Sequence, residues 1–362
     1  MKQVVRINPL DGSLRQAGDQ VTFVLPLGTY DLSTLRLWFL ASMTGTAGQQ
    51  SLPRDVETLI ETLEVYVGQV KVQHTSYYNQ IARILFDFDR EVNEVSQRSY
   101  LGNSLWINSG LGNTTLNTVN ALPCCMSKWV GFLGCGEVID TSFTGPIRIV
   151  ITLAPNQVLL ANITNAAYRL SDLHMTLETV SDSTPKSVGF DSYKSFLQGN
   201  ASYSQQTQMS LSARHIDYLI ATYLPPDYRS RAIANTTTDC GTSYFFAHGS
   251  GTGTLPSTTW NFKINGQNCI QYQPSLFQAT EFMNDLFPDS GSIASPLNTT
   301  KTGTSVILGQ SALNKYLWAT GLRLDLDAAD GVDLMSNFSL LVAKCDSLLR
   351  YDPKTKSYIF EA

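Results

Sequence analysis

The sequence is poor in charged residues. Asp, Glu, Lys and Arg make up only 15% of its 362 residues, whereas soluble proteins usually contain about 25%. Such a surface is explained either by burial against neighbouring subunits or by a coat of Ser, Thr, Asn and Gln. The net charge is −5, and no cluster of Lys or Arg occurs at the ends or elsewhere. A protein that coats nucleic acid directly normally carries a basic arm or stripe, so we expect no strong direct nucleic-acid binding.

Long apolar runs are missing too. The sequence contains no stretch of about 18 apolar residues, which a membrane-spanning helix would need. Its first residues, MKQVVRINPLDG, include no apolar segment of the kind found in signal peptides. We therefore expect a chain that neither spans a membrane nor is secreted, and that is made in a cytoplasm. Its six cysteines have no spacing typical of a disulfide framework, so we expect reduced thiols.

Motifs for catalysis are also lacking. The four histidines are His74, His174, His215 and His248, and no two of them are spaced as metal ligands. No nucleophile elbow, P-loop or dinucleotide-binding fingerprint occurs. A carboxylate pair such as Asp87 and Asp89 could in principle act in acid–base chemistry or hold calcium, although such pairs usually lie at a solvated helix end. The sequence therefore predicts no catalytic residue, no metal site and no cofactor.

Two segments of the chain follow one template. LEVYVGQVKVQHTSYYNQIARILFDF surrounds residue 68, and NFKINGQNCIQYQPSLFQATEFMNDLF surrounds residue 266, at an offset of 266 − 68 = 198. The residues that match at this offset are Gly68, Gln69, Gln73, Gln80 and Asp87 in the first segment and Gly266, Gln267, Gln271, Gln278 and Asp285 in the second. Each segment predicts a strand, a Gly-Gln hairpin turn, a second strand and an amphipathic helix, at 77–88 or 276–287. We interpret the two copies as a duplicated domain and their shared residues as structural.

The remainder of each half predicts short strands. Apolar residues alternate with polar ones in both halves, for example at Ile147, Ile149 and Ile151 and again at Leu322, Leu324 and Leu326. Further runs are Val21, Phe23, Leu25; Leu35, Leu37, Phe39; Leu173, Met175, Leu177; Met209, Leu211; Ile216, Tyr218, Ile220; and Phe338, Leu340, Val342. The last run is aligned with Leu173, Met175 and Leu177 at an offset of 338 − 173 = 165. The pattern predicts an all-β fold with one helix per half, built as two tandem β-sandwiches.

The predicted boundaries follow from composition. We expect a first sandwich with an N-terminal arm at 1–180, a linker at 181–206, a second sandwich at 207–346 and a C-terminal tail at 347–362. The long polar loops at 90–140, 227–259 and 288–305 are expected to be functional. The first two should lie mainly at one end of the sandwiches.

The chain resembles a known family of proteins. Tandem sandwiches with this strand–turn–strand–helix unit resemble the double jelly-roll major capsid proteins of tailless icosahedral viruses. The opening residues Leu25, Pro26, Tyr30, Asp31 and Leu32, the block RDVETLIETLEVYVGQ and the helix YNQIARIL are especially similar to those of lipid-containing bacteriophages. In length the chain is similar to the capsid proteins of finnlakeviruses and corticoviruses.

The resemblance implies a structural function without enzymatic activity. It implies eight strands per jelly roll and a homotrimeric capsomer, in which six jelly rolls form a pseudo-hexagon. The partners it implies are neighbouring capsomers, penton or vertex proteins, minor capsid proteins, and an underlying lipid membrane or its proteins. The implied location is the shell of the virion.

The sequence is also compatible with two other functions. A spike or vertex protein could share the strand pattern and would occur in few copies per particle. A tandem jelly-roll protein that binds or processes glycans would place exposed aromatic side chains beside carboxylates. Trp106, Trp129 and Trp260, which we expect in loops, are the candidates for such a surface.

Overall fold

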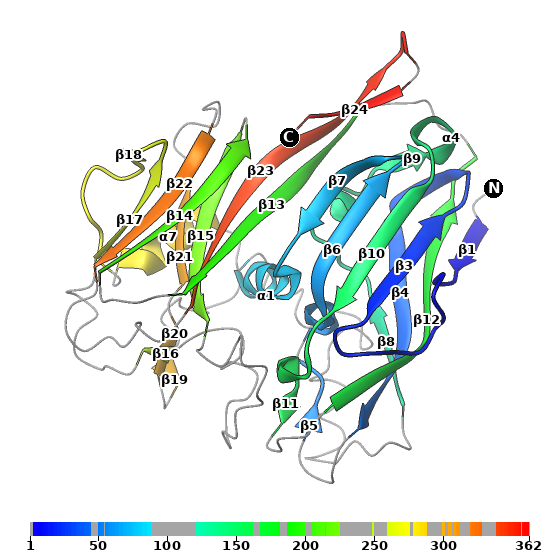
Figure 1. The fold of residues 1–362 in the computed structure, drawn as a ribbon, viewed down its shortest axis with the longest axis horizontal. Helices are drawn as coiled ribbons and strands as arrows, with labels where there is room; N and C mark the ends of the chain where they lie inside the picture. The colour runs from blue at the N-terminus through cyan, green and yellow to red at the C-terminus, as the bar shows by residue number, and fades with distance from the viewer. Residues whose placement is uncertain are drawn as a thin grey trace.

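The computed structural model places two antiparallel β-sandwiches side by side along the long axis of the chain (Figure 1). We call them the first and the second sandwich. The residues that the structure describes are 3–44, 50–53, 55–88, 121–161, 167–181, 187–199, 204–213, 215–224, 248–249, 259–275, 278–287, 299–300, 303–305, 307–311, 319–327, 338–355 and 357–361.

The first sandwich consists of two facing sheets with four main strands each. One sheet has the order β1 (Gln3–Ile7), β12 (Ala167–Thr179), β4 (Thr29–Thr44) and β8 (Leu122–Met126). The other has the order β3 (Gln20–Leu25), β10 (Ile147–Leu153), β6 (Ile60–Val67) and β7 (Val70–Thr75). Shorter elements are β2 (Arg15–Gln16), β5 (Gln50–Ser51), β9 (Val138–Asp140), β11 (Leu160–Ala161), α1 (Tyr78–Phe88), α4 (Thr141–Thr144), η1 (Val56–Leu59), η3 (Phe132–Gly134) and η4 (Asn156–Val158).

The second sandwich repeats this arrangement. Its first sheet has the order β13 (Val188–Gly199), β23 (Phe338–Asp352), β15 (Ile216–Leu224) and β21 (Ile307–Ser311). Its second sheet has the order β14 (Ser204–Ala213), β22 (Ala319–Asp327), β17 (Thr259–Ile264) and β18 (Gln267–Asn268). The remaining elements are α7 (Ala279–Leu286), β24 (Ser357–Glu361), β16 (His248–Gly249), β19 (Thr299–Thr300) and β20 (Gly303–Ser305).

The two sandwiches correspond strand by strand. In chain order the eight main strands of each half take the same places in the two sheets, and a helix follows the fifth strand in both. The predicted all-β fold, the strand runs and the two helices are therefore confirmed. Gly68 and Gly266 have φ of 59° and 81°, as expected for glycines in hairpin turns. The first turn is the predicted Gly68–Gln69, but the second is Asn265–Gly266, one residue earlier than predicted.

The strand patterns have a simple physical cause. In β3 and β10 the residues Val21, Phe23, Ile147 and Ile149 are fully buried, while the residues between them face outward. Successive side chains of a strand point to opposite faces, so alternation in the sequence becomes one apolar and one polar face. The two apolar faces pack on each other and form the core of the first sandwich.

Two predicted boundaries need correction. Residues 188–199, expected within a linker, form β13, which pairs with β23 from Val188 to Gly199. Residues 347–352, expected to begin a tail, continue β23, and β24 pairs back onto them. Both segments are rich in polar residues because one edge or face of each strand is exposed, and the change in composition was mistaken for the end of a domain.

The long loops fall mostly outside the described residues. This applies to 89–120, 225–247, 250–258 and 288–298, so the predicted placement of these loops at one end stays a prediction. The described neighbours of these segments include two small extra sheets, β5–β11 in the first sandwich and β16–β20–β19 in the second. Both lie toward the same end of the molecule, at the bottom of Figure 1.

Candidate functional site

The junction between the two sandwiches is an apolar interface. Ile220, Leu340 and Val342 point out of the second sandwich and belong to the same buried cluster as the core of the first sandwich. Leu341 and Ala343, which alternate with them along β23, belong to the separate core of the second sandwich. The sheet of β13, β23, β15 and β21 is thus buried on both faces, as its continuous apolar run LLVA requires.

This double burial corrects one correspondence drawn from the sequence. Leu340 and Val342 were aligned with Met175 and Leu177, which face the core of their own sandwich. In β23 it is the neighbouring residue, Leu341, that faces its own core. Shifting the alignment of a strand by one residue moves every side chain to the opposite face of the sheet. Because the run LLVA is apolar on both faces, its sequence does not show which of the two alignments is correct.

Aromatic rings strengthen the junction. The ring of Phe132 in η3 meets that of Phe190 in β13 edge-on at 5.1 Å, and Phe190 stacks on Phe360 of β24 at 6.1 Å. At the far end of β23, Tyr351 packs against Phe143 of α4 with 6.2 Å between ring centroids. The hairpin of β23 and β24 therefore reaches over the first sandwich, as its course in Figure 1 shows, and ties the two together.

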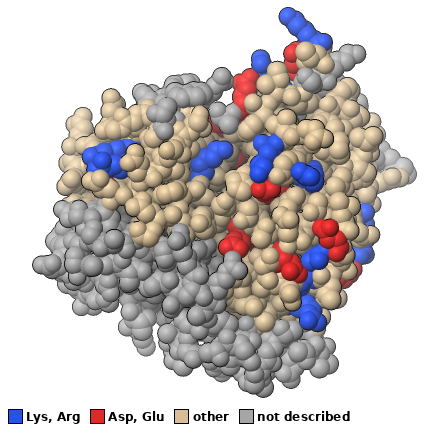
Figure 2. Space-filling model, in the orientation of Figure 1, with Lys and Arg blue, Asp and Glu red and all other residues tan. Residues whose placement is uncertain are grey.

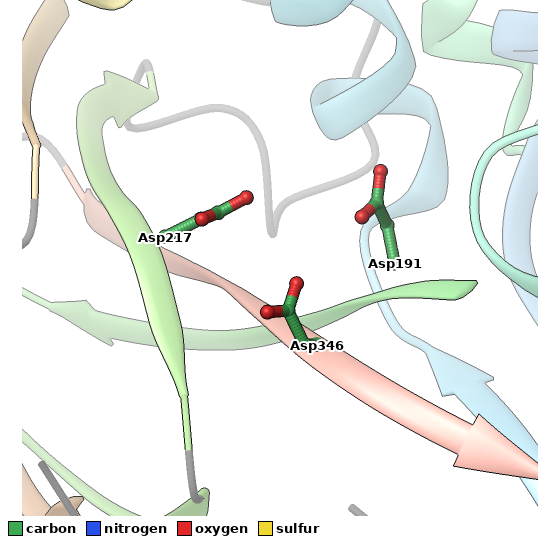
Figure 3. A group of neighbouring side chains, drawn as sticks. All are labelled: Asp191, Asp217 and Asp346. Atoms are coloured by element: carbon green, nitrogen blue, oxygen red, sulfur yellow. The ribbon is translucent and has the colours of Figure 1, made fainter. Parts of the chain in front are cut away.

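A half-buried lysine pairs with two of three clustered carboxylates in the second sandwich. Asp191, Asp217 and Asp346 come from three adjacent strands and turn toward one another (Figure 3). The Lys344 ammonium lies 3.2 Å from the carboxylate of Asp191 and 3.1 Å from that of Asp217. Burial by itself would lower the pKa of Lys344, but the two carboxylates overcome this effect, so its pKa is raised. Lys344 thus supplies the positive charge for Asp191 and Asp217, whereas the ring of His215 lies 3.8 Å from the carboxylate of Asp346.

A cavity of about 400 Å³ lies at the same junction. Its walls come from both sandwiches, with Trp129, Leu133 and Cys135 on one side and Asp191 and Tyr193 on the other. Asp191 thus faces both the cavity and Lys344. The apolar contacts of the junction therefore surround a small open volume of mixed polarity.

Gln73, one of the shared residues of the repeat, positions the first sandwich for this junction. Its side-chain amide donates to the carbonyl of Val130 at 2.9 Å, and its oxygen accepts from the Phe132 amide at 2.8 Å. The Tyr78 hydroxyl accepts a further bond from the Val130 amide at 3.0 Å. All of these groups are buried, so they fix the loop that presents Phe132 to Phe190.

Gly131 lies in this loop and is packed tightly. Its φ is 88°, and a Cβ there would lie 2.3 Å from the side chain of Gln73. We expect Gly131→Ala to lower the free energy of unfolding by about 2–3 kcal/mol, since both the backbone and the Gln73 hydrogen bonds would be strained. Urea unfolding measures this change. Gly12→Ala is the matched control, because Gly12 also has a positive φ but has no atom near the added Cβ; equal losses in both variants would contradict the steric part of the argument.

The matching residues of the second half have different surroundings. Gln271 is exposed, whereas Gln73 is buried. The corresponding buried amide in the second sandwich is that of Asn261, which donates to the carbonyls of Ile270 and Tyr272 at 2.9 and 3.1 Å. The sequence repeat therefore did not identify Asn261, whose signal, a polar residue inside the apolar strand WNFKI, was present but isolated.

The other residues of the repeat are structural. Gln69 is exposed in the first hairpin turn, whereas Gln267 is exposed as the first residue of β18, because the second turn consists of Asn265 and Gly266. Gln278 caps the segment before α7 by accepting from the Ser275 amide at 3.0 Å. Gln80 is buried in α1, Asp87 lies near the end of that helix, and Asp285 is exposed on α7. The structure does not bring these residues together into one site.

The cysteines bear on the expectation of reduced thiols, and the tryptophans bear on the expectation of an exposed aromatic surface. In the described part of the chain Cys124, Cys125, Cys269 and Cys345 are free thiols. Burial raises the pKa of Cys125 to about 11 and that of Cys345 to about 12, which makes them poor nucleophiles. Trp129 and Trp260 are 9% and 1% exposed, and Trp260 lies in β17 instead of a loop. They form no exposed aromatic surface for a glycan, and Trp106 lies outside the described residues.

Comparison with solved structures identifies the fold. No protein-family model and no curated protein matches the sequence. Among solved structures, the crystal structure of PBCV-1 VP54 fitted into a reconstruction of the virophage Sputnik matches 100% of this chain and 96% of its own, with a TM-score of 0.65 and 10% identity. The match to the Faustovirus major capsid protein covers 97% of this chain and 90% of that protein, with a TM-score of 0.61 and 9% identity. The match to the mavirus major capsid protein covers 99% of this chain and 90% of that protein, with a TM-score of 0.55 and 11% identity.

The fold is a double jelly roll. The agreement extends over the whole chain and both sandwiches, which confirms the fold class inferred from the repeat. Each sandwich is one jelly roll with eight main strands, and the junction described above joins the two. At about 10% identity the likeness establishes the fold alone. No helix in the described ranges has the length and apolar character needed to cross a lipid bilayer.

Proposed function

We propose that this chain is the major capsid protein of an icosahedral virus and assembles as trimeric, pseudo-hexagonal capsomers. The observation that carries the proposal is the double jelly-roll fold, shared over the full length with proteins described as major capsid proteins. In this function the protein binds no substrate. Its free energy of assembly comes from apolar area buried between neighbouring jelly rolls.

Two features of the molecule support an assembly function. The junction buries apolar side chains of both jelly rolls in one cluster, which favours their acting as one block in a shell. In addition, most of the described surface in Figure 2 is uncharged, and its Lys and Arg residues are scattered, several of them beside Asp or Glu. Such a surface favours burial against other subunits over strong binding to nucleic acid.

The finer parts of the proposal follow from the sequence resemblance. The partners would be neighbouring capsomers, penton or vertex proteins and minor capsid proteins, with a lipid membrane or its proteins beneath the shell. The protein would be made in the host cytoplasm, and the virus would be a lipid-containing bacteriophage. A spike or vertex protein is the second candidate, since it could have the same fold but would occur in few copies.

The expected result for the purified full-length protein is a homotrimer of about three times the 39.9 kDa chain mass, because obligate interfaces of this kind bury well over about 2,000 Å². Sedimentation velocity at micromolar concentration measures the mass, and negative-stain images of source particles measure copy number. A stable monomer at this concentration would count against the capsid proposal. Trimers present only at the vertices of a particle would favour the spike.

A further inference from the structure

The second copy of the repeated turn contains a dipeptide that the first copy lacks. Asn265 is the one asparagine of the sequence that a glycine follows, whereas Val67 precedes Gly68 in the first copy. In an Asn-Gly pair the backbone nitrogen of the glycine can attack the side-chain carbon of the asparagine, because the two are held close together and glycine has no side chain in the way. The duplication therefore supplies one turn with this chemistry and one without it.

The second turn is open to solvent and is held by a short strand. Asn265 and Gly266 are exposed, and a Cβ added at Gly266 would meet no atom within 4 Å. Gln267 and Asn268 form the two-residue strand β18, which pairs with β17 at the edge of its sheet. Gly266 lies between the paired residues, so its nitrogen takes no part in the ladder. The turn thus has the room that a ring closure between Asn265 and Gly266 needs.

The first turn is closed by comparison. The Gly68 amide donates to the carbonyl of Pro146 at 3.0 Å. A Cβ at Gly68 would lie 2.9 Å from the carbonyl oxygen of Thr144, so the space beside this turn is filled. The equivalent nitrogen of the first copy is therefore occupied by a hydrogen bond, in addition to lacking an asparagine before it.

A backbone amide of the neighbouring strand polarises the Asn265 side chain. The Gly321 N–H, near the start of β22, donates to Oδ1 of Asn265 at 3.3 Å, and the Asn265 N–H donates to the Gly321 carbonyl at 2.9 Å. When a nucleophile attacks the side-chain carbon, negative charge develops on Oδ1. The Gly321 N–H already points at this oxygen, so it stabilises the charge as an oxyanion-hole donor does.

We propose that Asn265 is a self-modification site of the folded chain, where it is converted to aspartate and isoaspartate with water as the co-reactant. The Gly266 nitrogen gives up its proton and forms a bond to the side-chain carbon of Asn265, and the bond from that carbon to the side-chain nitrogen breaks, which releases ammonia. Water then opens the cyclic imide at either of its two carbonyl carbons, and the Gly266 nitrogen regains a proton. The net change replaces NH₂ by OH, and nothing is oxidised or reduced.

The two products affect the second jelly roll differently. Aspartate leaves the path of the backbone unchanged and adds one negative charge at the turn. Isoaspartate leads the backbone through the side-chain carbon, which lengthens the turn by a methylene and puts the Lys263–Asn268 pair out of register. Because β18 has two paired residues, we expect it to detach from β17. Beyond β18 the Asn261 side chain still donates to the Ile270 carbonyl, so the change should stay local.

The first test follows the native full-length protein in heavy-oxygen water at neutral pH and physiological temperature. Peptide mass spectrometry measures the fraction of each asparagine that has lost ammonia and gained the labelled oxygen. We expect this fraction to be about tenfold or more higher at Asn265 than at Asn268, which is also exposed but is followed by Cys269. Equal fractions at the two positions overturn the proposal. Modification in the urea-unfolded chain without modification in the native chain overturns it as well.

The second test measures the consequence for β18. Asn265→Gly is the matched variant, because glycine accepts the positive φ of the turn, 52° at Asn265, but has no side-chain amide. After the same incubation, hydrogen exchange at residues 267–269 should be about tenfold faster in the isoaspartate fraction of the wild type, and unchanged in the variant. Unchanged exchange in that fraction, or equal acceleration in the variant, overturns the predicted release of β18.

Discussion

Leu340→Ala and Leu341→Ala should each lower the free energy of unfolding by about 2–5 kcal/mol, but through different parts of the molecule. The two residues are adjacent in β23 and both are 0% exposed. Leu341 faces the core of the second jelly roll, so its truncation leaves a cavity there. Leu340 faces the first jelly roll, so its truncation leaves a cavity in the junction.

The two variants should therefore differ in cooperativity. We expect Leu341→Ala to destabilise the second jelly roll itself, and Leu340→Ala to loosen its coupling to the first. Calorimetry of the Leu340→Ala protein should resolve two transitions more clearly than calorimetry of the wild type. Ile359→Ala is the control, because Ile359 is 40% exposed. This substitution should lower the free energy of unfolding by less than about 0.5 kcal/mol. Identical transitions for the two leucine variants would contradict the assignment of opposite faces.

Lys344→Met should lower the free energy of unfolding by about 1–3 kcal/mol near neutral pH. Removing Lys344 from this half-buried group leaves the carboxylates of Asp191 and Asp217 close together without their shared ion-pair partner. The expected loss of unfolding free energy is smaller than for a fully buried ion pair, because the Asp191 side chain is 47% exposed and is screened by water. Urea unfolding measures the change, and Lys354→Met, which removes an exposed charge, is the matched control.

The pH dependence of this variant has a definite sign. The pKa of Lys344 is raised above its ordinary value of 10.5, so its contribution to stability is fully present below that pH and is lost as the pH rises through the raised value. The difference between wild type and Lys344→Met should stay constant up to about pH 10 and shrink above it. Adding Asp217→Asn to Lys344→Met should recover part of the loss near neutral pH. No recovery would contradict the role given to the carboxylate pair.

The amino-acid sequence by itself determined the duplication, the strand and helix types and the all-β class. Its two turn glycines, its alternating runs and its amphipathic helices act over a few residues, and strand and helix formation depend mainly on such local patterns. For this reason Gly68 and Gly266 were correctly placed in turns, and the helices were found within a few residues of their observed bounds.

Only the tertiary structure decided what each repeated residue contacts. Gln73 is buried at the junction because η3 and β13 pack over it, while Gln271 is exposed because no jelly roll of the same chain covers its side. In the same way Leu340 faces the first jelly roll, although the run LLVA is apolar on both faces, and residues 188–199 form a strand because β23 offers them an edge. These outcomes depend on surfaces brought together from distant parts of the chain, and local sequence patterns contain no information about which surfaces will meet.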